Sequence, residues 1–418
     1  MYQVKTLAIA GLMWVGVAGP ALGQQNVRFA TFNTSFSVDD AGELLDGLTN
    51  PVFGTVIDFR ARNVAEIIQR VNPDVLLINE FDYEPSGASI QAFITNYLNV
   101  GQNGQAPVDY GHVYLRPSNT GVQPGDQPGV DGSLINFDND SATSADGDPN
   151  DAYGFGEHPG HFGMVLLSKY PIFEAQSRTF QTFLWDDMPN NRIPTASDPS
   201  TADPNDGWFT PLELEQFRLS SKSHWDVAID VNGETVHALA SHPTPPVFDG
   251  LEDLNGRRNA DEIRFWQDYI QSSADPDTLD DDYIYDDQGV YGGIEEGASF
   301  VILGDLNADP DEGDGISEAI TGLLNDPLVN DPVPTGAGGT DPDDTATFGL
   351  RADYAVPSSD LEVIDAGVFW PTVSEPGGTA VFWSDHRLVY VDVVVPEPAL
   401  ATVVMMGAGL LTLRARAR

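Results

Sequence analysis

The chain has 418 residues, and its 19 Lys and Arg residues against 64 Asp and Glu residues give a formal net charge of −45. This charge disfavours partners that are held mainly by a basic surface, such as long nucleic acid or an anionic membrane. Because the chain has no cysteine, disulfide bonds, thiolate zinc sites and cysteine nucleophiles are excluded. The length fits two or three domains, or one large α/β domain with insertions.

The N-terminal segment predicts a secretory signal peptide. Residues 1–23 contain one basic residue, Lys5, then an apolar run over 7–17 and small residues up to Gly23. This order is typical of a signal peptide that is cleaved after Gly23. A buried first helix is the alternative interpretation.

The next part of the chain predicts a strand, a helix and a second strand. Residues 27–32 alternate like a strand, residues 60–71 carry apolar side chains at helical spacing, and residues 75–78 form an apolar run. A second helix is expected over residues 89–98. Residues 101–160 are rich in Gly, Pro, Asp and Asn without periodicity, which indicates a long loop or insertion.

The second half of the chain repeats the strand, helix, strand order between residues 236 and 304. Asn232-Gly233 is a strong hairpin turn signal between two strand patterns. The expected strands are 163–167, 225–231, 236–240, 300–303, 351–356 and 387–394, and the expected helix is 257–270. The expected loops, which are mostly acidic, are 185–215, 274–289 and 309–344.

Polar side chains follow several of the apolar strands directly. They are Asn33, Glu80, His242, Asp305 and Asn307. In α/β sheets, chemistry collects where loops leave the carboxyl ends of the strands. We therefore expect these side chains to lie near one another.

Seven short motifs occur in an order that resembles one superfamily. They are Thr31-Phe32-Asn33-Thr34, residues 73–80 ending in Glu80, residues 163–172, His242, Gly304-Asp305-Leu306-Asn307, Arg351-Ala352-Asp353-Tyr354 and Ser384-Asp385-His386. This set resembles the endonuclease/exonuclease/phosphatase superfamily, the metal-dependent phosphoesterases that include deoxyribonuclease I, abasic-site endonucleases, bacterial sphingomyelinases and inositol polyphosphate phosphatases. The resemblance implies an α/β fold, a four-layer α/β/β/α sandwich with two packed mixed sheets, to which this chain adds long acidic loop insertions. It also implies one catalytic domain over residues 24–395.

Hydrolysis of a phosphoester needs a cation, an oriented water molecule and a base or strong acceptor for its proton. Carboxylate and amide oxygens suit Mg²⁺ or Mn²⁺. Carried over from the resemblance, Glu80 would bind the metal, with Asn33 and Asp385 at or near its coordination shell.

The resemblance also implies catalytic roles. Asp305 would orient or deprotonate the attacking water, and Asn307 would hold the phosphate or the Asp305 carboxylate. His386 would contact a phosphoryl oxygen and be oriented by Asp353. His242 would act as leaving-group acid, although its proline-rich loop could simply need a packed imidazole.

Further cationic and aromatic side chains lie near the motifs. Candidate phosphate contacts are Lys222, His224, Arg257 and Arg258, and ion pairing with acidic neighbours is their alternative role. Trp185, Trp208 and Phe248 could stack on a ring, although loop packing is the more common role of such side chains.

The C-terminus resembles a PEP-CTERM sorting tail. Pro396-Glu397-Pro398 precedes an uncharged stretch over 399–413, and Arg414, Arg416 and Arg418 follow. The resemblance implies that residues 396–418 carry a short transmembrane segment that anchors the protein transiently. We therefore expect an exported protein of the cell envelope or exterior that meets the export and C-terminal sorting machinery.

Together these features predict an exported Mg²⁺- or Mn²⁺-dependent phosphoesterase, and His242 favours a phosphodiesterase or nuclease-like activity. Residues 24–395 hold 15 basic and 63 acidic residues, a formal charge of −48, so no stable complex with long DNA is expected. We expect a monomer. A phosphomonoesterase acting on inositol phosphates or nucleotides, a lipid phosphodiesterase and a non-catalytic surface or matrix protein are the alternatives.

Overall fold

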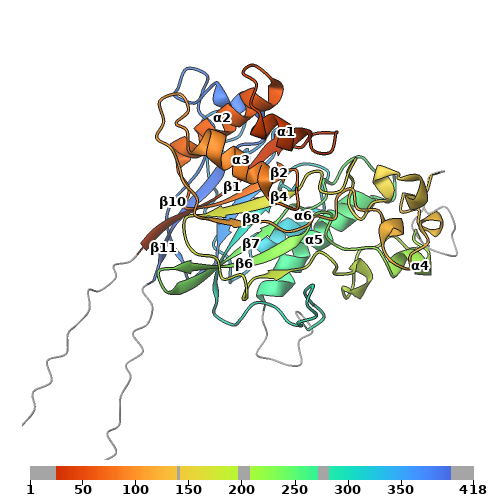
Figure 1. Cartoon of the computed structure of the whole chain (residues 1–418). Helices are drawn as coiled ribbons and strands as arrows, with labels where there is room; N and C mark the ends of the chain where they lie inside the picture. Colours follow the sequence, from red (N-terminus) through yellow and green to blue (C-terminus); the bar gives the residue numbers. More distant parts are fainter. Residues whose placement is uncertain (1–24, 139–141, 196–207, 272–281, 397–418) are drawn as a thin grey trace, which may run out of the picture.

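The computed structural model describes residues 25–138, 142–195, 208–271 and 282–396 (Figure 1). The predicted signal peptide and all of the predicted tail after Pro396 lie outside the described residues. No helix of the described part is long and apolar enough to cross a membrane.

The described residues form a six-stranded mixed sheet in the order β10-β11-β1-β2-β4-β3. β1 and β2 are parallel, and the other neighbours are antiparallel. The strands are β1 (Gln25–Phe36), β2 (Val75–Phe81), β3 (His112–Tyr114), β4 (Met164–Ser168), β10 (Glu362–Val368) and β11 (Val389–Val395).

A five-stranded mixed sheet, again counted over the described residues, has the order β5-β6-β7-β8-β9. β7 and β8 are parallel, as β1 and β2 are in the first sheet, and the other neighbours are antiparallel. The strands are β5 (Arg178–Thr179), β6 (His224–Val231), β7 (Glu234–Ser241), β8 (Ser299–Asp305) and β9 (Asp353–Pro357).

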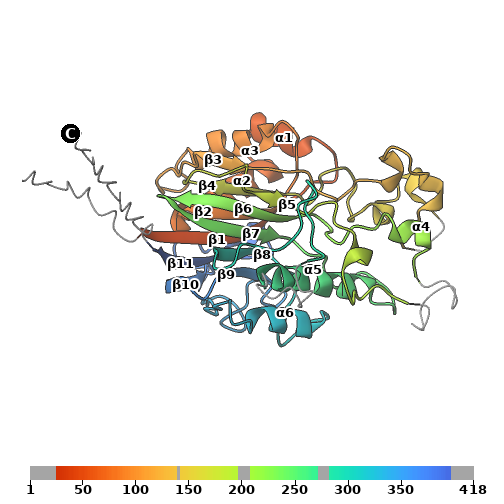
Figure 2. The ribbon, with the colours of Figure 1, turned by 90° about the horizontal axis from the view of Figure 1, so that it is seen from below.

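Helices cover the outer face of each sheet (Figure 2). The helices over the first sheet are α1 (Glu43–Thr49), α2 (Val56–Val71) and α3 (Ala88–Phe93), which continues as a π-helix over Ile94–Leu98. The helices over the second sheet are α5 (Leu254–Ile270) and α6 (Ser317–Leu324). α4 (Pro211–Leu214) lies in an insertion at one end of the molecule (Figure 1).

Three apolar clusters fill the spaces between the four layers. In β1, Val27 and Phe29 pack between the sheets, whereas Ala30 and Phe32 pack under α1–α3. This division follows from the alternation of side chains along a strand. The third cluster lies between the second sheet and α5 and α6. The predicted α/β/β/α sandwich is confirmed.

The structure also adds elements that the sequence patterns did not predict. α2 begins at Val56, before the expected residue 60, because the Thr55 side chain caps it by accepting from the Asp58 N–H. The expected loop 101–160 contains β3, and the expected loop 309–344 contains α6. α1 and β10 were not predicted. Short 3₁₀ helices occur at Pro124–Asp126, Gly132–Leu134, Ser144–Asp146, Pro149–Asp151, Trp185–Asp187 and Ala380–Trp383.

Candidate active site

The predicted site residues converge where the two sheets meet at one end of the sandwich. Asn33 and Glu80 lie near the carboxyl ends of the parallel strands β1 and β2, and Asp305 ends β8. His242 directly follows β7, the parallel neighbour of β8. Because each parallel pair directs its carboxyl ends to the same edge, residues from distant parts of the chain meet there.

Asn33 joins the carboxylates of the two sheets. Its Nδ2 donates to Glu80 Oε1 at 3.0 Å and to Asp305 Oδ2 at 2.9 Å. The Ser35 N–H donates to Asn33 Oδ1 at 3.1 Å, which fixes the orientation of the amide. Asn33 therefore holds the two carboxylates in position through its nitrogen, and its position beside Glu80 is compatible with the predicted place at or near the coordination shell.

Two histidines point to the same oxygen of Asp305. Nε2 of His242 lies 3.5 Å from Asp305 Oδ2, and Nε2 of His386 lies 3.6 Å from it. Nδ1 of His386 is 2.8 Å from Asp353 Oδ2, which also accepts from the Thr345 hydroxyl at 2.8 Å. The structure thus contains the imidazole–carboxylate pair expected of His386 and Asp353.

The environments of the two histidines differ in charge. Burial lowers the pKa of His386, but the carboxylates of Asp353 and Asp305 raise it more, so the pKa lies well above its ordinary value. Burial, aided by the positive charge of Lys222, lowers the pKa of His242 well below its ordinary value. The surroundings therefore favour the protonated form of His386 and the neutral form of His242, and pKa values that are pushed apart in this way separate acid and base roles.

Asp305 is arranged as a proton acceptor. Its Oδ1 accepts from the Asn307 N–H at 3.0 Å, and Asn307 Nδ2 donates to Pro243 O, next to His242, at 3.1 Å. Burial raises the pKa of Asp305 to about 6, so its carboxylate is a stronger base than an exposed aspartate. Asn307 and Glu80 both have left-handed backbones, with φ of 52° and 54°. Such strain in residues other than glycine is concentrated at functional sites.

The residues present fit a divalent cation. Asp305, Asp353 and His386 are buried, and each offers a ligand atom within 4.8 Å of the others. Asp353 Oδ1 is buried without a hydrogen-bond partner in the described part of the chain. Burial also raises the pKa of Glu80, whose Oε2 has a weak bond of 3.4 Å from the Ser37 hydroxyl. A bound cation would offset the unfavourable burial of these carboxylates.

Asp385 lies at the rim of this group. Its side chain is exposed, and its Oδ1 accepts from the Ser35 hydroxyl at 3.1 Å. The neighbouring Ser384 hydroxyl donates to Asn33 O at 2.8 Å. These bonds place Asp385 at the edge of the buried cluster.

Of the four candidate phosphate contacts, Lys222 and Arg258 line a cavity beside the site. Lys222 is buried and lines a cavity together with Glu80 and His242, and burial lowers its pKa. Arg258 lines the same cavity, but its guanidinium donates to the carbonyls of Tyr153, Leu219 and Arg218.

His224 and Arg257 do not line that cavity. Burial lowers the pKa of His224 to about 4, its Nδ1 bonds the Ser220 hydroxyl at 2.6 Å and its Nε2 bonds Glu262 O at 2.9 Å. The ring also packs against Phe265 and Trp266, so the proposed phosphate contact of His224 is replaced by a packing role. Arg257 Nη1 donates to Arg192 O at 3.5 Å.

Glu262 supports the site and was not predicted. Its Oε1 accepts from the Ser221 N–H, and its Oε2 accepts from the Thr244 N–H, each at 2.6 Å. These bonds fix the two chain segments that carry Lys222 and His242 at the cavity. The available signal was a charged residue on the apolar face of the predicted helix 257–270.

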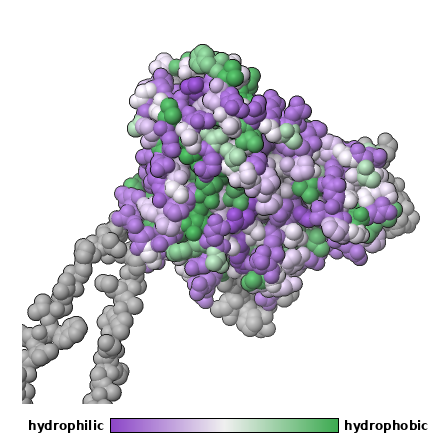
Figure 3. Space-filling model, viewed as in Figure 1, coloured by the Kyte–Doolittle hydropathy of each residue, from purple (hydrophilic) through white to green (hydrophobic). Residues whose placement is uncertain are grey.

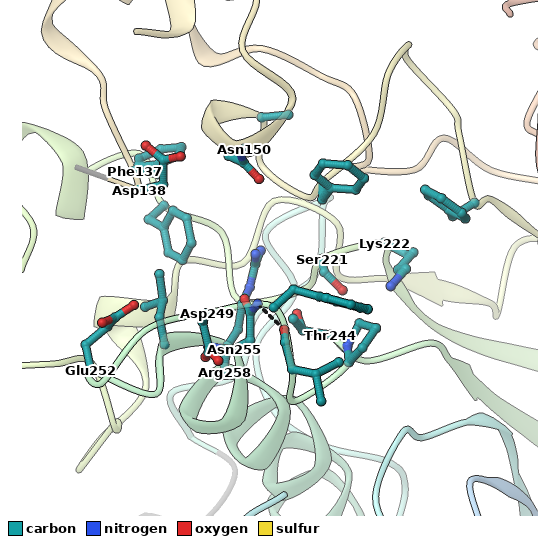
Figure 4. A pocket seen from close by; sticks show the side chains of 18 of the residues that line it. Phe137, Asp138, Asn150, Ser221, Lys222, Thr244, Asp249, Glu252, Asn255 and Arg258 are labelled. Carbon is teal, nitrogen blue, oxygen red and sulfur yellow. Dashed lines mark hydrogen bonds between the residues drawn. The ribbon is translucent and has the colours of Figure 1, made fainter. Parts of the chain in front are cut away.

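In the described part of the chain, two cavities, called hollows below, lie beside the cluster of Glu80, Asp305, His242 and His386. The larger, of 580 Å³, reaches Glu80, Lys222 and His242 (Figure 4). The smaller, of 350 Å³, is lined by Ser35, Arg60, Thr347, Phe382, Trp383, Ser384, Asp385 and Arg387. They share no lining residue, so each can hold a different group beside the cluster.

Comparison with known protein families gives one match. The model of the "Endonuclease/Exonuclease/phosphatase family" matches residues 30–386. Among curated proteins, none is significantly similar to the chain.

Several solved structures are similar to the chain at low sequence identity. An endonuclease/exonuclease/phosphatase from Beutenbergia cavernae DSM 12333 is 15% identical, with a TM-score of 0.46 over 88% of this chain and 72% of that one. The human Nocturnin catalytic domain with bound sulfate is 13% identical, with a TM-score of 0.43 over 89% and 98%. A beta toxin from Staphylococcus aureus with bound magnesium ions is 15% identical, with a TM-score of 0.40 over 88% and 99%. From the family match over most of its length, the chain belongs to the endonuclease/exonuclease/phosphatase family of metal-dependent phosphoester hydrolases.

Proposed function

We propose that this hydrolase is a phosphodiesterase that uses Mg²⁺ or Mn²⁺ and acts on small phosphodiesters. The observation that carries the proposal is the pair of separate hollows beside one catalytic cluster. A phosphodiester has two substituents on phosphorus, and two hollows can receive both. A phosphomonoester would leave one of them without a substrate group.

The side chains of the site have different roles in hydrolysis. Glu80 would hold the cation, with Asn33 and Asp385 at or near its coordination shell. When bound, the cation supplies positive charge that offsets the charge developing on the phosphate oxygens. Asp305, oriented by Asn33 and Asn307, accepts the proton of the attacking water.

The two histidines have different tasks in this proposal. Cationic His386, held by Asp353, contacts a phosphoryl oxygen and stabilises its negative charge. Burial lowers the pKa of His242 and so favours its neutral form in the free protein. A bound phosphate places negative charge beside it and beside Lys222, which favours uptake of a proton that His242 can then pass to the leaving oxygen.

The charge of the molecule supports a small substrate. The formal charge of residues 24–395 is −48. Figure 3 shows a largely hydrophilic face, with apolar side chains at the top and in a stretch left of centre below it. A long polyanion would meet repulsion over most of such a surface, whereas a single phosphodiester meets mainly the local charge of the site.

We also propose that the protein is exported, anchored transiently by its C-terminal tail, and monomeric. The sequence patterns of residues 1–23 and 396–418 support export and anchoring. The described ends of the chain lie together, because Gln25 pairs with Val395 at the end of β1 opposite to Asn33. A tail that anchors the protein there would leave the active site at the far end of the sandwich. Imaging of a tagged full chain, with and without residues 396–418, tests this location, and retention of the truncated form would contradict the anchoring role.

A substrate panel tests the proposed activity. Purified protein is assayed on a small phosphodiester, plasmid DNA, sphingomyelin, an inositol phosphate and a phosphomonoester, with Mg²⁺, with Mn²⁺ and with EDTA. We expect metal-dependent hydrolysis that is fastest for the small phosphodiester. A preference for phosphomonoesters would overturn the diesterase proposal, and hydrolysis that EDTA does not reduce would overturn the role of the metal.

A further inference from the structure

The larger hollow extends from the catalytic residues into a space that the proposed chemistry does not use. Its volume of 580 Å³ is in the range of small-molecule pockets. Figure 4 shows Lys222 and Ser221 on one side, and Phe137, Asp138 and Glu252 at the opposite end. The hollow is therefore long enough to hold a substituent whose phosphate lies at the Lys222 end.

Aromatic side chains from several loops line this hollow. They are Phe137, Phe155 and Phe162 from the segment between β3 and β4, Trp208 and Phe217 from the segment between β5 and β6, and Phe248 from the loop before α5. The rings of Phe137 and Phe217 are buried and pack edge to face at 4.5 Å. Trp208 Nε1 donates to Phe137 O at 2.9 Å, which holds the indole in place. This side of the hollow is a preformed apolar wall.

Two further aromatic rings are exposed to solvent at the hollow. Phe155 is 52% exposed, and Phe248 is 95% exposed with a left-handed backbone at φ 69°. A bulky residue rarely adopts that conformation, so the surrounding loop holds Phe248 in a strained state. Exposed rings beside a preformed apolar wall are suited to stacking on a flat group of a ligand.

Charge along the hollow is asymmetric. Its positively charged lining residues, among the described ones, are Lys222 and Arg258, and the Arg258 guanidinium is bonded to three carbonyls. Its acidic lining residues are Glu80, which lies at the Lys222 end where the cation would bind, and Asp138, Asp249 and Glu252. An anionic group can therefore be neutralised at the Lys222 end, whereas a second anionic group deeper in the hollow would meet carboxylates.

We propose that this hollow is a substrate subsite for an uncharged, ring-bearing substituent of the phosphodiester and that it rejects a substituent carrying a further negative charge. The subsite rests on the proposed phosphodiesterase function, because it receives one of the two groups on phosphorus. It selects small aromatic phosphodiesters over chains of linked phosphates.

A matched set of substrates tests the subsite. Diethyl phosphate, dibenzyl phosphate and bis(4-carboxybenzyl) phosphate all have primary alkoxide leaving groups and differ in ring and charge. With Mg²⁺, we expect kcat/KM to be about tenfold or more higher for dibenzyl than for diethyl phosphate, since one stacked ring contributes about that much. The carboxylated substrate should lose this advantage.

Substitutions at the exposed rings separate stacking from folding. Phe155→Ala and Phe248→Ala remove exposed side chains, so the fold should persist, and each should lower the ratio of dibenzyl to diethyl kcat/KM about fivefold or more. Phe53→Ala is the matched control, because Phe53 is 80% exposed and does not line the hollow.

A double variant tests the charge selectivity of the hollow. Glu252→Gln with Asp249→Asn should reduce the discrimination against the carboxylated substrate.

The outcomes distinguish the two proposals. If diethyl and dibenzyl phosphate are both hydrolysed at equal kcat/KM, and the ring variants do not change their ratio, the subsite is overturned while the phosphodiesterase function stands. If neither diester is hydrolysed but a phosphomonoester is, the proposed function itself fails. Quenching of tryptophan fluorescence by dibenzyl phosphate in EDTA reports binding without turnover, and its absence would also contradict the subsite.

Discussion

Asn33 Nδ2 donates a hydrogen bond of 2.9 Å to Asp305 Oδ2, although the two residues are 272 positions apart and belong to different sheets. The same nitrogen donates to Glu80 at 3.0 Å. One buried amide therefore sets the distance between the carboxylate proposed to bind metal and the carboxylate proposed to accept the proton.

Replacing Asn33 by alanine should reduce activity more than it disturbs the fold. We expect kcat/KM for a small phosphodiester to fall about 10- to 100-fold, as is typical when a residue that orients metal-site groups is lost. Loss of the buried bonds should lower the free energy of unfolding by about 1–3 kcal/mol. Kinetics and urea denaturation measure both effects. Asn50→Ala, which removes an exposed amide, is the control, and wild-type kinetics in Asn33→Ala would contradict the orienting role.

Glu80→Gln and His386→Ala should each abolish phosphoesterase activity and leave the fold intact. The first removes the charge proposed to hold the metal, and the second removes the cation that faces the phosphoryl oxygen, so we expect losses of about 10²-fold or more. Activity assays and circular dichroism are the measurements. Glu296→Gln changes an exposed glutamate and serves as the control. Retention of substantial activity by either variant would mean that its role has been assigned incorrectly.

Mg²⁺ should raise the melting temperature of the protein. Glu80, Asp305 and Asp353 are close together at the buried site, and a ligand that binds only the folded state stabilises it by about 2.7 kcal/mol at a hundredfold excess over Kd. Thermal unfolding with increasing Mg²⁺ measures this effect without any substrate. In Glu80→Gln the increase should be much smaller. Equal increases in the two proteins would exclude Glu80 as a ligand.

His224 should make the folded state sensitive to acid. Burial lowers its pKa from 6.5 to about 4, so between these values the unfolded chain binds a proton that the folded protein does not. This contribution to stability is complete above about pH 6.5 and is lost as the pH falls towards 4, amounting to about 3 kcal/mol.

The variant His224→Gln isolates this effect. Glutamine keeps a donor for the Glu262 carbonyl but does not titrate, so the variant should lose about 3 kcal/mol less than the wild type when urea denaturation is repeated from about pH 7 to pH 4. Other acidic groups titrate equally in both proteins and cancel in the comparison. Parallel loss of stability in the two proteins would show that His224 is not the titrating group.

The fold was largely predictable where local patterns are strong. Strands β1, β2, β7 and β8 were recognised because buried strands flanked by helices read as short apolar or alternating runs. β3 and β10 were missed because an edge strand of three residues and an exposed strand have no such pattern. Their conformation depends on pairing with β4 and β11, which are distant in the chain.

The sequence predicted which residues carry the chemistry of the candidate site, but not the residues that hold them in position. Glu80, Asp305 and His386 stand in recognisable motifs, whereas Glu262 lies within an ordinary amphipathic helix. His224 shows the opposite case, because a histidine beside Lys222 looked like a phosphate contact and proved to be a packed ring. Whether such a side chain faces a cavity or the core depends on the twist and packing of the sheet that carries it.

By itself, the sequence determined the order of the strongly patterned strands and helices, the phosphoesterase motifs and the acidic charge, since these depend on residue type and short-range spacing. Only the tertiary structure decided that Asn33 offers its nitrogen to two carboxylates, that the pKa of His386 is raised while that of His242 is lowered, and that several loops build an aromatic hollow beside Lys222. These properties arise from burial and from contacts between segments hundreds of residues apart, and neither can be read from local spacing.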